Sequence, residues 1–90
     1  MRRAKVDAKQ KEIVRALRQI GATVQHLHMV GRGCPDILAG YHGKNHLMEI
    51  KTGNAKLTTD EQAFFDTWEG QVAVVRNVAD ALSVLSVFAE

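Results

Sequence analysis

The sequence predicts a small α/β domain whose elements follow one another in the order α-β-β-β-α-β-α. Two observations predict this class: apolar residues recur at helical spacing in three segments, and short runs rich in β-branched residues lie between them. With 90 residues, of which 46% are hydrophobic, the chain suits one globular core. We therefore expect a single domain over residues 1–90, with a four-stranded mixed sheet flanked by helices.

The first helix is predicted to begin near Asp7 and to end before Gly21. The side chain of Asp7 can cap the helix, and Gln10 stands where a capping box needs it. An apolar stripe at helical spacing runs from Ile13 to Ile20, and Gly21 is a common helix terminator. Basic side chains occupy the opposite face, which we expect to be exposed.

Three strands are predicted to follow this helix. The segment 22–30 is rich in β-forming residues and partly alternating, so it favours a strand that ends at the glycines of 31–33. The segment 37–39 is a short apolar strand, 41–45 a hairpin turn and 46–51 the returning strand. Because the strands of this hairpin carry apolar residues on both faces, we expect them at the centre of the sheet, covered by helices.

The second half of the chain predicts two helices around a strand. Thr58 and Glu61 form a capping box that starts a helix, which continues to Gly70. The valine-rich segment 71–76 is the fourth strand, and the segment 78–88 is the final helix.

Composition excludes several classes of protein. The single cysteine cannot form an internal disulfide, and no Cys/His cluster has the spacing of a zinc site. No apolar run approaches the ~20 residues that a membrane helix needs. The basic N-terminus is not followed by the apolar stretch of a signal peptide. We therefore expect a soluble, cytoplasmic protein.

The net charge of +2 conceals a strong asymmetry along the chain. Residues 1–18 carry a net charge of +5, residues 19–57 of +2 and residues 58–90 of −5. A basic first half suits a polyanion such as nucleic acid. The alternative is a solvated, lysine-rich helix face without a partner.

Three charged residues fall within the otherwise apolar hairpin. Glu49 and Lys51 stand two residues apart on one strand, so they share a face of the sheet. Asp36 enters the neighbouring strand, and a hairpin of this length brings it near Glu49. Charged groups are rare on central strands unless they are paired or bind a ligand. The alternative is a surface Glu–Lys pair on an edge strand, with Asp36 starting a turn.

Two neighbouring carboxylates repel each other unless a cation lies between them. Oxygen ligands of this kind suit Mg²⁺ or Mn²⁺. Such an ion can activate water and neutralise the charge of a phosphodiester. Beside it, Lys51 would orient or deprotonate the attacking water, or stabilise the transition state.

Several motifs, in order, resemble those of one nuclease family. Together they are similar to the VRR-NUC (virus-type replication-repair nuclease) family of the PD-(D/E)xK nuclease superfamily, over about residues 12–80. The resemblance implies a restriction-endonuclease-like core and a Mg²⁺- or Mn²⁺-dependent endonuclease that hydrolyses DNA phosphodiester bonds. The matching segments are Gly33-Cys34-Pro35-Asp36-Ile37, Met48-Glu49-Ile50-Lys51-Thr52, Leu57-Thr58 with Gln62, and Gly70 before the valine-rich strand.

The resemblance also implies roles for individual residues. Asp36 and Glu49 match the metal-binding carboxylates of the family, with the carbonyl of Ile50 as a further ligand. Lys51 matches the catalytic lysine. Beyond the metal ion, no small-molecule cofactor is implied.

Two more residues complete the predicted catalytic set. Glu12 matches a first-helix glutamate that completes the metal shell through water, and the alternative is a surface pair with Arg15. Gln62 matches a glutamine that supports the site, and the alternative is a surface glutamine in the first helical turn.

The expected partner is DNA, contacted through its phosphates. Such contacts position DNA but read no sequence, so we expect selectivity for DNA structure, as in branched DNA. The candidate residues are the basic side chains Arg2, Arg3, Lys5, Lys9, Lys11, Arg15, Arg18, Arg32, Lys44 and Lys56.

A homodimer is also expected. Standalone members of the family are associated with homodimers that cut four-way (Holliday) junctions, which suggests a role in DNA repair in a bacterial or phage-infected cell. In this chain Val84, Val87 and Phe88 widen the apolar stripe of the last helix beyond one core-facing seam. The alternative is a fully packed terminal helix.

Two other functions stay open. The chain can be a non-catalytic nucleic-acid-binding module on a nuclease fold, against which the intact Asp36, Glu49 and Lys51 argue. It can also be a sequence-specific restriction-type nuclease, although the chain has no spare module for reading bases.

The aromatic and histidine residues are assigned ordinary roles. Trp68 and the phenylalanines at helical spacing are expected in the core rather than as base-stacking groups. His26 and His28 share a strand face without a third ligand, which favours a polar surface or a DNA contact over a metal site.

Overall fold

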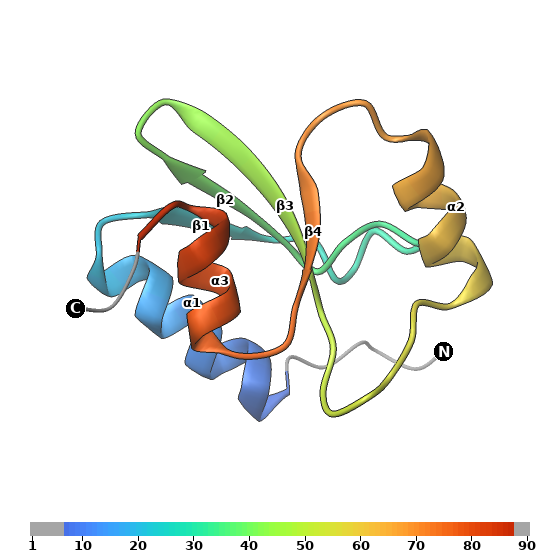
Figure 1. The fold of residues 1–90 in the computed structure, drawn as a ribbon, viewed down its shortest axis with the longest axis horizontal. Helices are drawn as coiled ribbons and strands as arrows, with labels where there is room; N and C mark the ends of the chain where they lie inside the picture. Colours follow the sequence, from blue (N-terminus) through green and yellow to red (C-terminus); the bar gives the residue numbers. More distant parts are fainter. Residues whose placement is uncertain (1–6, 88–90) are drawn as a thin grey trace.

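The structure, a computed structural model, describes residues 7–87 and confirms the predicted order of elements (Figure 1). It is an α/β fold in which helices flank a four-stranded mixed sheet. No helix in this part of the chain is long and apolar enough to cross a membrane. The elements are α1 (Ala8–Gln19), β1 (Thr23–His26), β2 (Ile37–Tyr41), β3 (Lys44–Ile50), α2 (Thr59–Thr67), β4 (Val72–Val75) and α3 (Val78–Val84).

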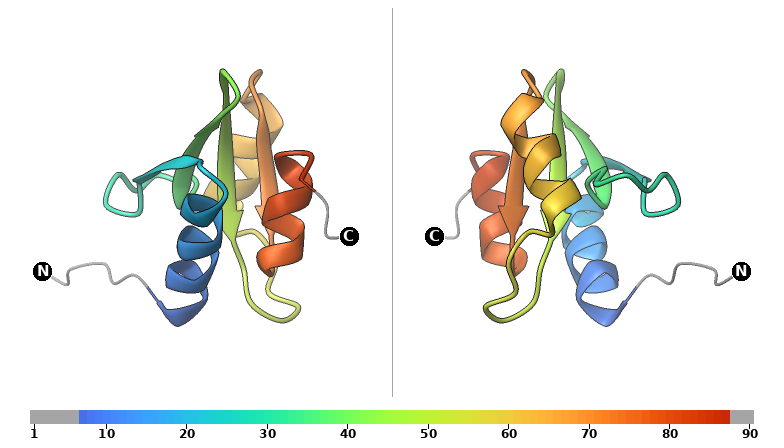
Figure 2. Two further views of the ribbon diagram at one scale, coloured as in Figure 1. Left: turned by 90° about the vertical axis from the view of Figure 1, so that its left-hand side faces the viewer. Right: turned by 90° about the vertical axis from the view of Figure 1, so that its right-hand side faces the viewer.

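The sheet has the strand order β1-β2-β3-β4, so the hairpin strands β2 and β3 are central, as predicted. β1, β2 and β3 pair antiparallel, and β4 runs parallel to β3. The helices α1 and α3 cover one face of the sheet and α2 lies on the other (Figure 2). The two faces therefore have different neighbours, and this difference separates the core from the candidate site.

The caps of α1 explain its length. The carboxylate of Asp7 accepts a hydrogen bond of 2.8 Å from the N–H of Gln10, which confirms the predicted N-cap. The Gln10 side chain does not close a capping box but lies 3.0 Å from Nδ1 of His26. At the other end, Gly21 has a φ of +95°, and the N–H of Ala22 donates to the carbonyl of Leu17. These are the features of a Schellman motif, which ends the helix at the predicted glycine.

β1 is shorter than predicted. The N–H of Leu27 still donates to the carbonyl of Asp36, at 2.7 Å, but the chain then turns and Val30 donates back to the Leu27 carbonyl. β2 begins only at Ile37, so residues beyond Leu27 have no strand to pair with. The β-forming composition of Met29 and Val30 is therefore overruled by the lack of a neighbour.

The β2–β3 hairpin is tighter than the sequence suggests. Its loop contains only His42 and Gly43, which have φ values of +50° and +80°. Positive φ at both loop residues is the arrangement of a type I′ turn, which matches the twist of the flanking strands. The register pairs Ile37 with Met48 and Tyr41 with Lys44.

The core lies between the sheet and the pair α1 and α3. Ile13, Leu17, Ile37, Met48 and Val75 are fully buried there. By contrast, no residue of α2 is buried, so α2 adds little to this core.

α3 ends earlier than predicted, at Val84. Ser86 has a φ of +63°, and the N–H of Val87 donates to the carbonyl of Leu82, so the chain leaves the helix in a left-handed cap. Val84 and Val87 pack against the core. They therefore leave no exposed apolar stripe on α3 for the predicted dimer interface. Phe88, the third residue of that prediction, lies outside the described residues.

Candidate active site

Asp36 and Glu49 lie opposite each other at one end of the β2–β3 hairpin. The register pairs Ile37 with Met48, which brings the adjoining Asp36 and Glu49 together. The Oδ2 atom of Asp36 accepts a hydrogen bond of 2.8 Å from the N–H of Ile50. The structure thus brings together the two carboxylates as the sequence predicts.

Lys51 lies beside these carboxylates, on the face of the sheet that α2 covers. Its Nζ atom is 3.6 Å from Oε2 of Glu49 and 2.6 Å from Oε1 of Glu61. The side chains of Lys51, Glu49 and Glu61 are 14%, 4% and 17% exposed. The ammonium group is therefore held between a strand carboxylate and a helix carboxylate, away from most of the solvent.

Glu61 is the residue of this cluster that the sequence reasoning did not assign to the site. As predicted, it closes the capping box of α2, because its Oε1 atom accepts a hydrogen bond of 2.9 Å from the N–H of Thr58. The same oxygen also faces Lys51. One signal was available: Glu61 stands three and four residues before Phe64 and Phe65, so it shares their face of α2.

Gly33 holds α2 close to the loop that carries Asp36. It has a φ of +78°, and a Cβ atom there would lie 2.9 Å from the backbone nitrogen of Glu61 and closer still to the carbonyl of Asp60. Only glycine fits this contact and this conformation without strain. The contact fixes the first turn of α2, and therefore Glu61, against the Asp36 loop.

The two strand carboxylates perturb each other. Burial raises the pKa of Glu49 to about 8, and the charges of Asp36 and Glu61 add to the rise. Burial also raises the pKa of Asp36, although the hydrogen bond from Ile50 opposes it. The charge of Lys51 opposes the rise of both pKa values without cancelling it, so Glu49 keeps its proton at neutral pH unless a further cation binds.

Lys51 stays protonated at neutral pH. Burial alone would lower the pKa of its ammonium group, but the hydrogen bond and charge of Glu61 and the charge of Glu49 outweigh burial and raise it. Burial would likewise raise the pKa of Glu61, yet the hydrogen bond from Lys51 holds it below its ordinary value. Lys51 is therefore a donor of hydrogen bonds rather than a base.

The donor set of the cluster suits a hard divalent cation with few protein ligands. Within residues 7–87, no three His, Cys, Asp or Glu side chains are arranged as a metal-binding group. Asp36 and Glu49 nevertheless supply two mutually repelling carboxylates, and Mg²⁺ commonly binds one or two carboxylates and completes its shell with water and phosphate. The residues thus fit such an ion as a two-carboxylate site. The carbonyl of Ile50 as a further ligand stays a prediction.

Glu12 does not join this cluster. Its side chain is 58% exposed and pairs at 3.3 Å with Lys9, rather than with Arg15. Gln10 is the buried polar residue of α1, because it shares a face with Ile13 and Leu17, whereas Glu12 lies about 100° away from Ile13. The predicted place of Glu12 in the metal shell is therefore not supported by its position.

Gln62 also points away from the cluster. Its amide donates a hydrogen bond of 2.8 Å to Asp66, one turn further along the exposed side of α2. The inward position on this turn belongs to its neighbour Glu61.

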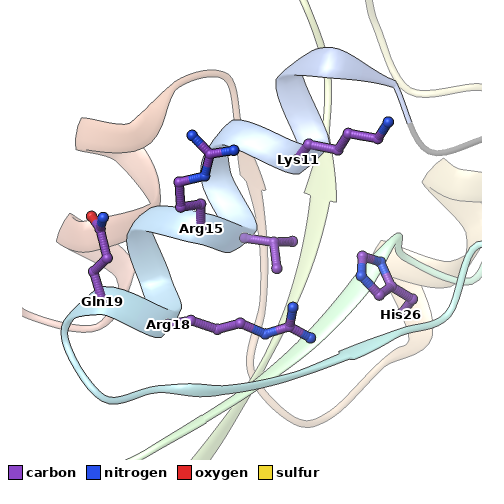
Figure 3. A pocket seen from close by; sticks show the side chains of 6 residues that line it. Lys11, Arg15, Arg18, Gln19 and His26 are labelled. Atoms are coloured by element: carbon purple, nitrogen blue, oxygen red, sulfur yellow. The ribbon is translucent and has the colours of Figure 1, made fainter.

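A basic groove lies between α1 and β1. It has a volume of about 630 Å³, and Figure 3 shows basic side chains of α1 on one side of it and His26 on the other. From His26 the chain leads directly to Leu27, which is hydrogen-bonded to the backbone of Asp36. The groove thus reaches the end of β1 that adjoins Asp36, but it lies on the α1 side of the sheet, whereas Glu49 and Lys51 lie on the α2 side. Its lining residues are Lys11, Val14, Arg15, Arg18, Gln19 and His26.

The other predicted DNA contacts are dispersed. Arg32 and Lys56 are exposed in the loops that precede Asp36 and follow Lys51. Lys44 stands beside the hairpin turn, at the far end of the strands from the carboxylates. The remaining predictions are Lys9, which pairs with Glu12, and Arg2, Arg3 and Lys5, which lie outside the described residues.

Comparison of the chain with protein-family models, with curated proteins and with solved structures finds no match. The likeness to the VRR-NUC family therefore stays a prediction from the motifs alone.

The close contact at Gly33 can be tested with two glycines of one loop. Gly31 and Gly33 have φ values of +79° and +78°, but a Cβ atom on Gly31 would meet nothing within 4 Å. Both alanine variants place a side chain at a similar positive φ, so the backbone strain is alike. Only the Cβ atom of Gly33→Ala would clash with the backbone of α2. We expect Gly33→Ala to lower the free energy of unfolding by about 1–3 kcal/mol more than Gly31→Ala in urea denaturation. Equal losses would contradict the contact.

The raised pKa of Glu49 predicts a pH dependence of stability without metal. The folded state keeps a proton on Glu49 up to about pH 8, whereas the unfolded state loses it near the ordinary value of 4.5. The free energy of unfolding should therefore fall as pH rises through this window. Burial lowers the pKa of His46, which acts in the opposite direction below its ordinary value of 6.5.

The variant Glu49→Gln isolates the contribution of Glu49. Between about pH 5 and pH 8.5 in EDTA, wild type should lose about 1–3 kcal/mol more than Glu49→Gln, as measured by urea denaturation. Identical pH profiles would show that Glu49 has an ordinary pKa.

Proposed function

We propose that the chain is a divalent-metal-dependent endonuclease that hydrolyses DNA phosphodiester bonds, with a preference for branched DNA such as four-way junctions. The observation that carries the proposal is the juxtaposition of Asp36 and Glu49 with a charged, largely buried Lys51. Burying such groups is costly, so clusters of this kind concentrate at functional sites. The motifs that resemble the VRR-NUC family support the same conclusion.

In this proposal Asp36 and Glu49 hold Mg²⁺ or Mn²⁺. A bound ion of this kind neutralises charge on the phosphate and lowers the pKa of a coordinated water. The bound cation would lower the raised pKa values of both carboxyl groups, because it would allow Asp36 and Glu49 to be ionised together. No other cofactor is required.

Lys51 stabilises the transition state rather than accepting a proton. In hydrolysis the water oxygen bonds to phosphorus, the bond to the departing sugar oxygen breaks, the water loses a proton to solvent and the departing oxygen gains one. Negative charge accumulates on the phosphate oxygens, where a protonated Lys51 can donate a hydrogen bond. Because contacts with Glu61 and Glu49 raise the pKa of Lys51, the deprotonating role is the weakest of those that the sequence allows.

Glu61 is a positioning residue in this scheme. It contacts Lys51 at 2.6 Å and is itself held by the N–H of Thr58. It would therefore keep the ammonium group charged and directed towards the carboxylates.

The basic groove supplies the expected path for DNA. Its cations lie on α1, whose first turn contacts His26 near the end of β1 that adjoins Asp36, so DNA in the groove would pass round the β1 edge of the sheet to reach the carboxylates. A two-fold dimer remains part of the proposal. It rests on the family resemblance alone, because Val84 and Val87 pack against the core and leave no apolar surface on α3 for a partner. We propose that the enzyme acts in the cytoplasm of a bacterial or phage-infected cell, in DNA repair.

Cleavage assays test the assigned residues. With Mg²⁺ we expect cleavage of a four-way junction in preference to linear duplex, measured on end-labelled DNA in denaturing gels. Lys51→Ala should lower the cleavage rate by at least about 100-fold, because a charged donor at the transition state is lost. Glu49→Gln should behave similarly. Glu12→Gln is the matched control and should keep nearly full activity, since Glu12 faces solvent.

Each other outcome has a clear meaning. Unchanged activity in Lys51→Ala would refute the site. Binding without cleavage in any divalent metal would favour the non-catalytic module, and a cut at one defined sequence in linear duplex would favour the restriction-type nuclease.

The groove predicts a salt dependence of DNA binding. Each phosphate contact contributes about 0.9 to the slope of log K against log salt. The double variant Lys11→Gln with Arg15→Gln should therefore reduce the slope by about 2 in anisotropy titrations of labelled junction DNA. Arg76→Gln removes a charge away from the groove, where Arg76 donates to the carbonyl of Gly53, and should leave the slope unchanged. Equal slopes for all three proteins would place the DNA elsewhere.

A further inference from the structure

Next to the carboxylate cluster, on the α2 side of the sheet, lies a second cavity with a different character. It has a volume of about 420 Å³, which is within the range of small-ligand pockets. Its lining is mostly apolar and aromatic, with two amide side chains. The residues are Leu27, Cys34, Leu38, Asn45, Leu47, Phe64, Trp68, Gly70 and Gln71, and we refer to it as the aromatic cavity.

The aromatic rings of this cavity form a stacked pair that is open to solvent. The rings of Phe64 and Trp68 are 4.9 Å apart between centroids and only 16° from parallel. Trp68 is 46% exposed, so the prediction that it belongs to the core is wrong. The reason is that α2 ends at Thr67, and Trp68 caps it in an extended conformation instead of continuing the buried face.

Trp68 is joined to the last turn of α2 through its backbone. The N–H of Trp68 donates to the carbonyl of Phe64 at 2.9 Å. The chain then passes so close to the indole that a Cβ atom on Gly70 would lie 2.8 Å from its Nε1 atom. An exposed indole that stacks on Phe64 and lies against the chain at Gly70 offers a flat surface to a further ring.

The aromatic cavity adjoins the carboxylate cluster. Cys34 lines the cavity and stands two residues before Asp36. Leu47 also lines the cavity and stands two residues before Glu49 on β3, so it shares a face of the sheet with Glu49. On the other side, Phe64 follows Glu61 by three residues and so lies on the same face of α2.

Polar groups border the apolar walls. The amide of Gln71 donates to the carbonyl of Asn45 at 2.7 Å, and both side chains line the cavity. Amide side chains are suited to the edges of bases. Phe64 also lines a neighbouring hollow with Arg32, Asp60, Ala63 and Thr67, which puts one cation beside the cavity.

From this arrangement we infer that the aromatic cavity binds one unpaired nucleobase of the DNA strand, next to the phosphodiester at the carboxylate cluster. The inference rests on the proposed function. The base stacks on the Trp68 and Phe64 pair, Asn45 and Gln71 face its edge, and Arg32 faces a neighbouring phosphate. A base in a continuous duplex is paired and stacked, whereas bases at a branch are readily unstacked, so the cavity would favour branched or single-stranded DNA.

The single tryptophan provides a direct test. Trp68 is the only tryptophan in the chain, so fluorescence excited where the tyrosine does not absorb reports on the aromatic cavity alone. Titration with a short oligothymidylate in EDTA should quench this fluorescence and saturate. A fully paired hairpin duplex at the same concentrations should quench it far less. No quenching by either DNA, or equal quenching by both, would overturn the inference.

Variants provide the second test, with anisotropy of a labelled flap or junction that contains unpaired bases. Trp68→Ala should weaken binding about tenfold or more, Trp68→Phe should retain most of the affinity, and binding to paired duplex should be unchanged in both. Met29→Ala removes another exposed apolar side chain, 64% exposed and outside the cavity, and should have no effect. Unchanged affinity in Trp68→Ala would refute base binding.

The outcomes separate this inference from the proposed function. Cleavage without quenching would refute the base site and leave the nuclease standing. Saturable quenching without cleavage in any divalent metal would refute the nuclease and leave the base site standing. If Trp68 fluorescence changed with protein concentration in the absence of DNA, in step with dimerisation in sedimentation, a second copy of the chain would occupy the cavity and the inference would fail.

Discussion

The ion pair between Lys51 and Glu61 is the interaction on which the rest of the site depends. It joins the end of β3 to the first turn of α2, and its 2.6 Å contact keeps an ammonium group beside Glu49 in a largely buried place. Without this ammonium, the carboxyl groups of Asp36, Glu49 and Glu61 would gather with no cation among them. The same oxygen of Glu61 also caps α2. A change in Glu61 would therefore disturb both the position of the helix and the charge of Lys51.

The fold separates stability from chemistry by using the two faces of one sheet. Alternation along β3 sends Met48 and Ile50 into the core under α1 and α3, and sends Glu49 and Lys51 to the other side. α2 has no buried residue, and it meets the rest of the fold through the Gly33 contact, the Lys51–Glu61 pair and the half-buried Phe64 and Phe65. The face that α2 covers is therefore open enough to leave the aromatic cavity beside the charged groups.

Much of this arrangement is predictable from sequence, because it follows from local rules. Period-two alternation and a short hairpin are enough to bring Asp36, Glu49 and Lys51 together, and capping residues locate the helix starts. The misses have tertiary causes. Glu61 already had a local role in its capping box, Gln62 lies one position off the inward face, and Glu12 is one residue out of phase with the stripe that buries Gln10. Trp68 became a surface residue because α2 stops before it.

The most direct test of the central claim, that Asp36 and Glu49 form a cation site poised by mutual repulsion, is the number of protons released on Mg²⁺ binding. Isothermal titration calorimetry at pH 7 in two buffers of different ionisation enthalpy measures this number. Because the pKa of Glu49 is about 8 without metal, binding should release about one proton per ion in wild type and in Glu12→Gln, and far less in Glu49→Gln. Mg²⁺ binding without proton release, or no binding at all, would contradict the account.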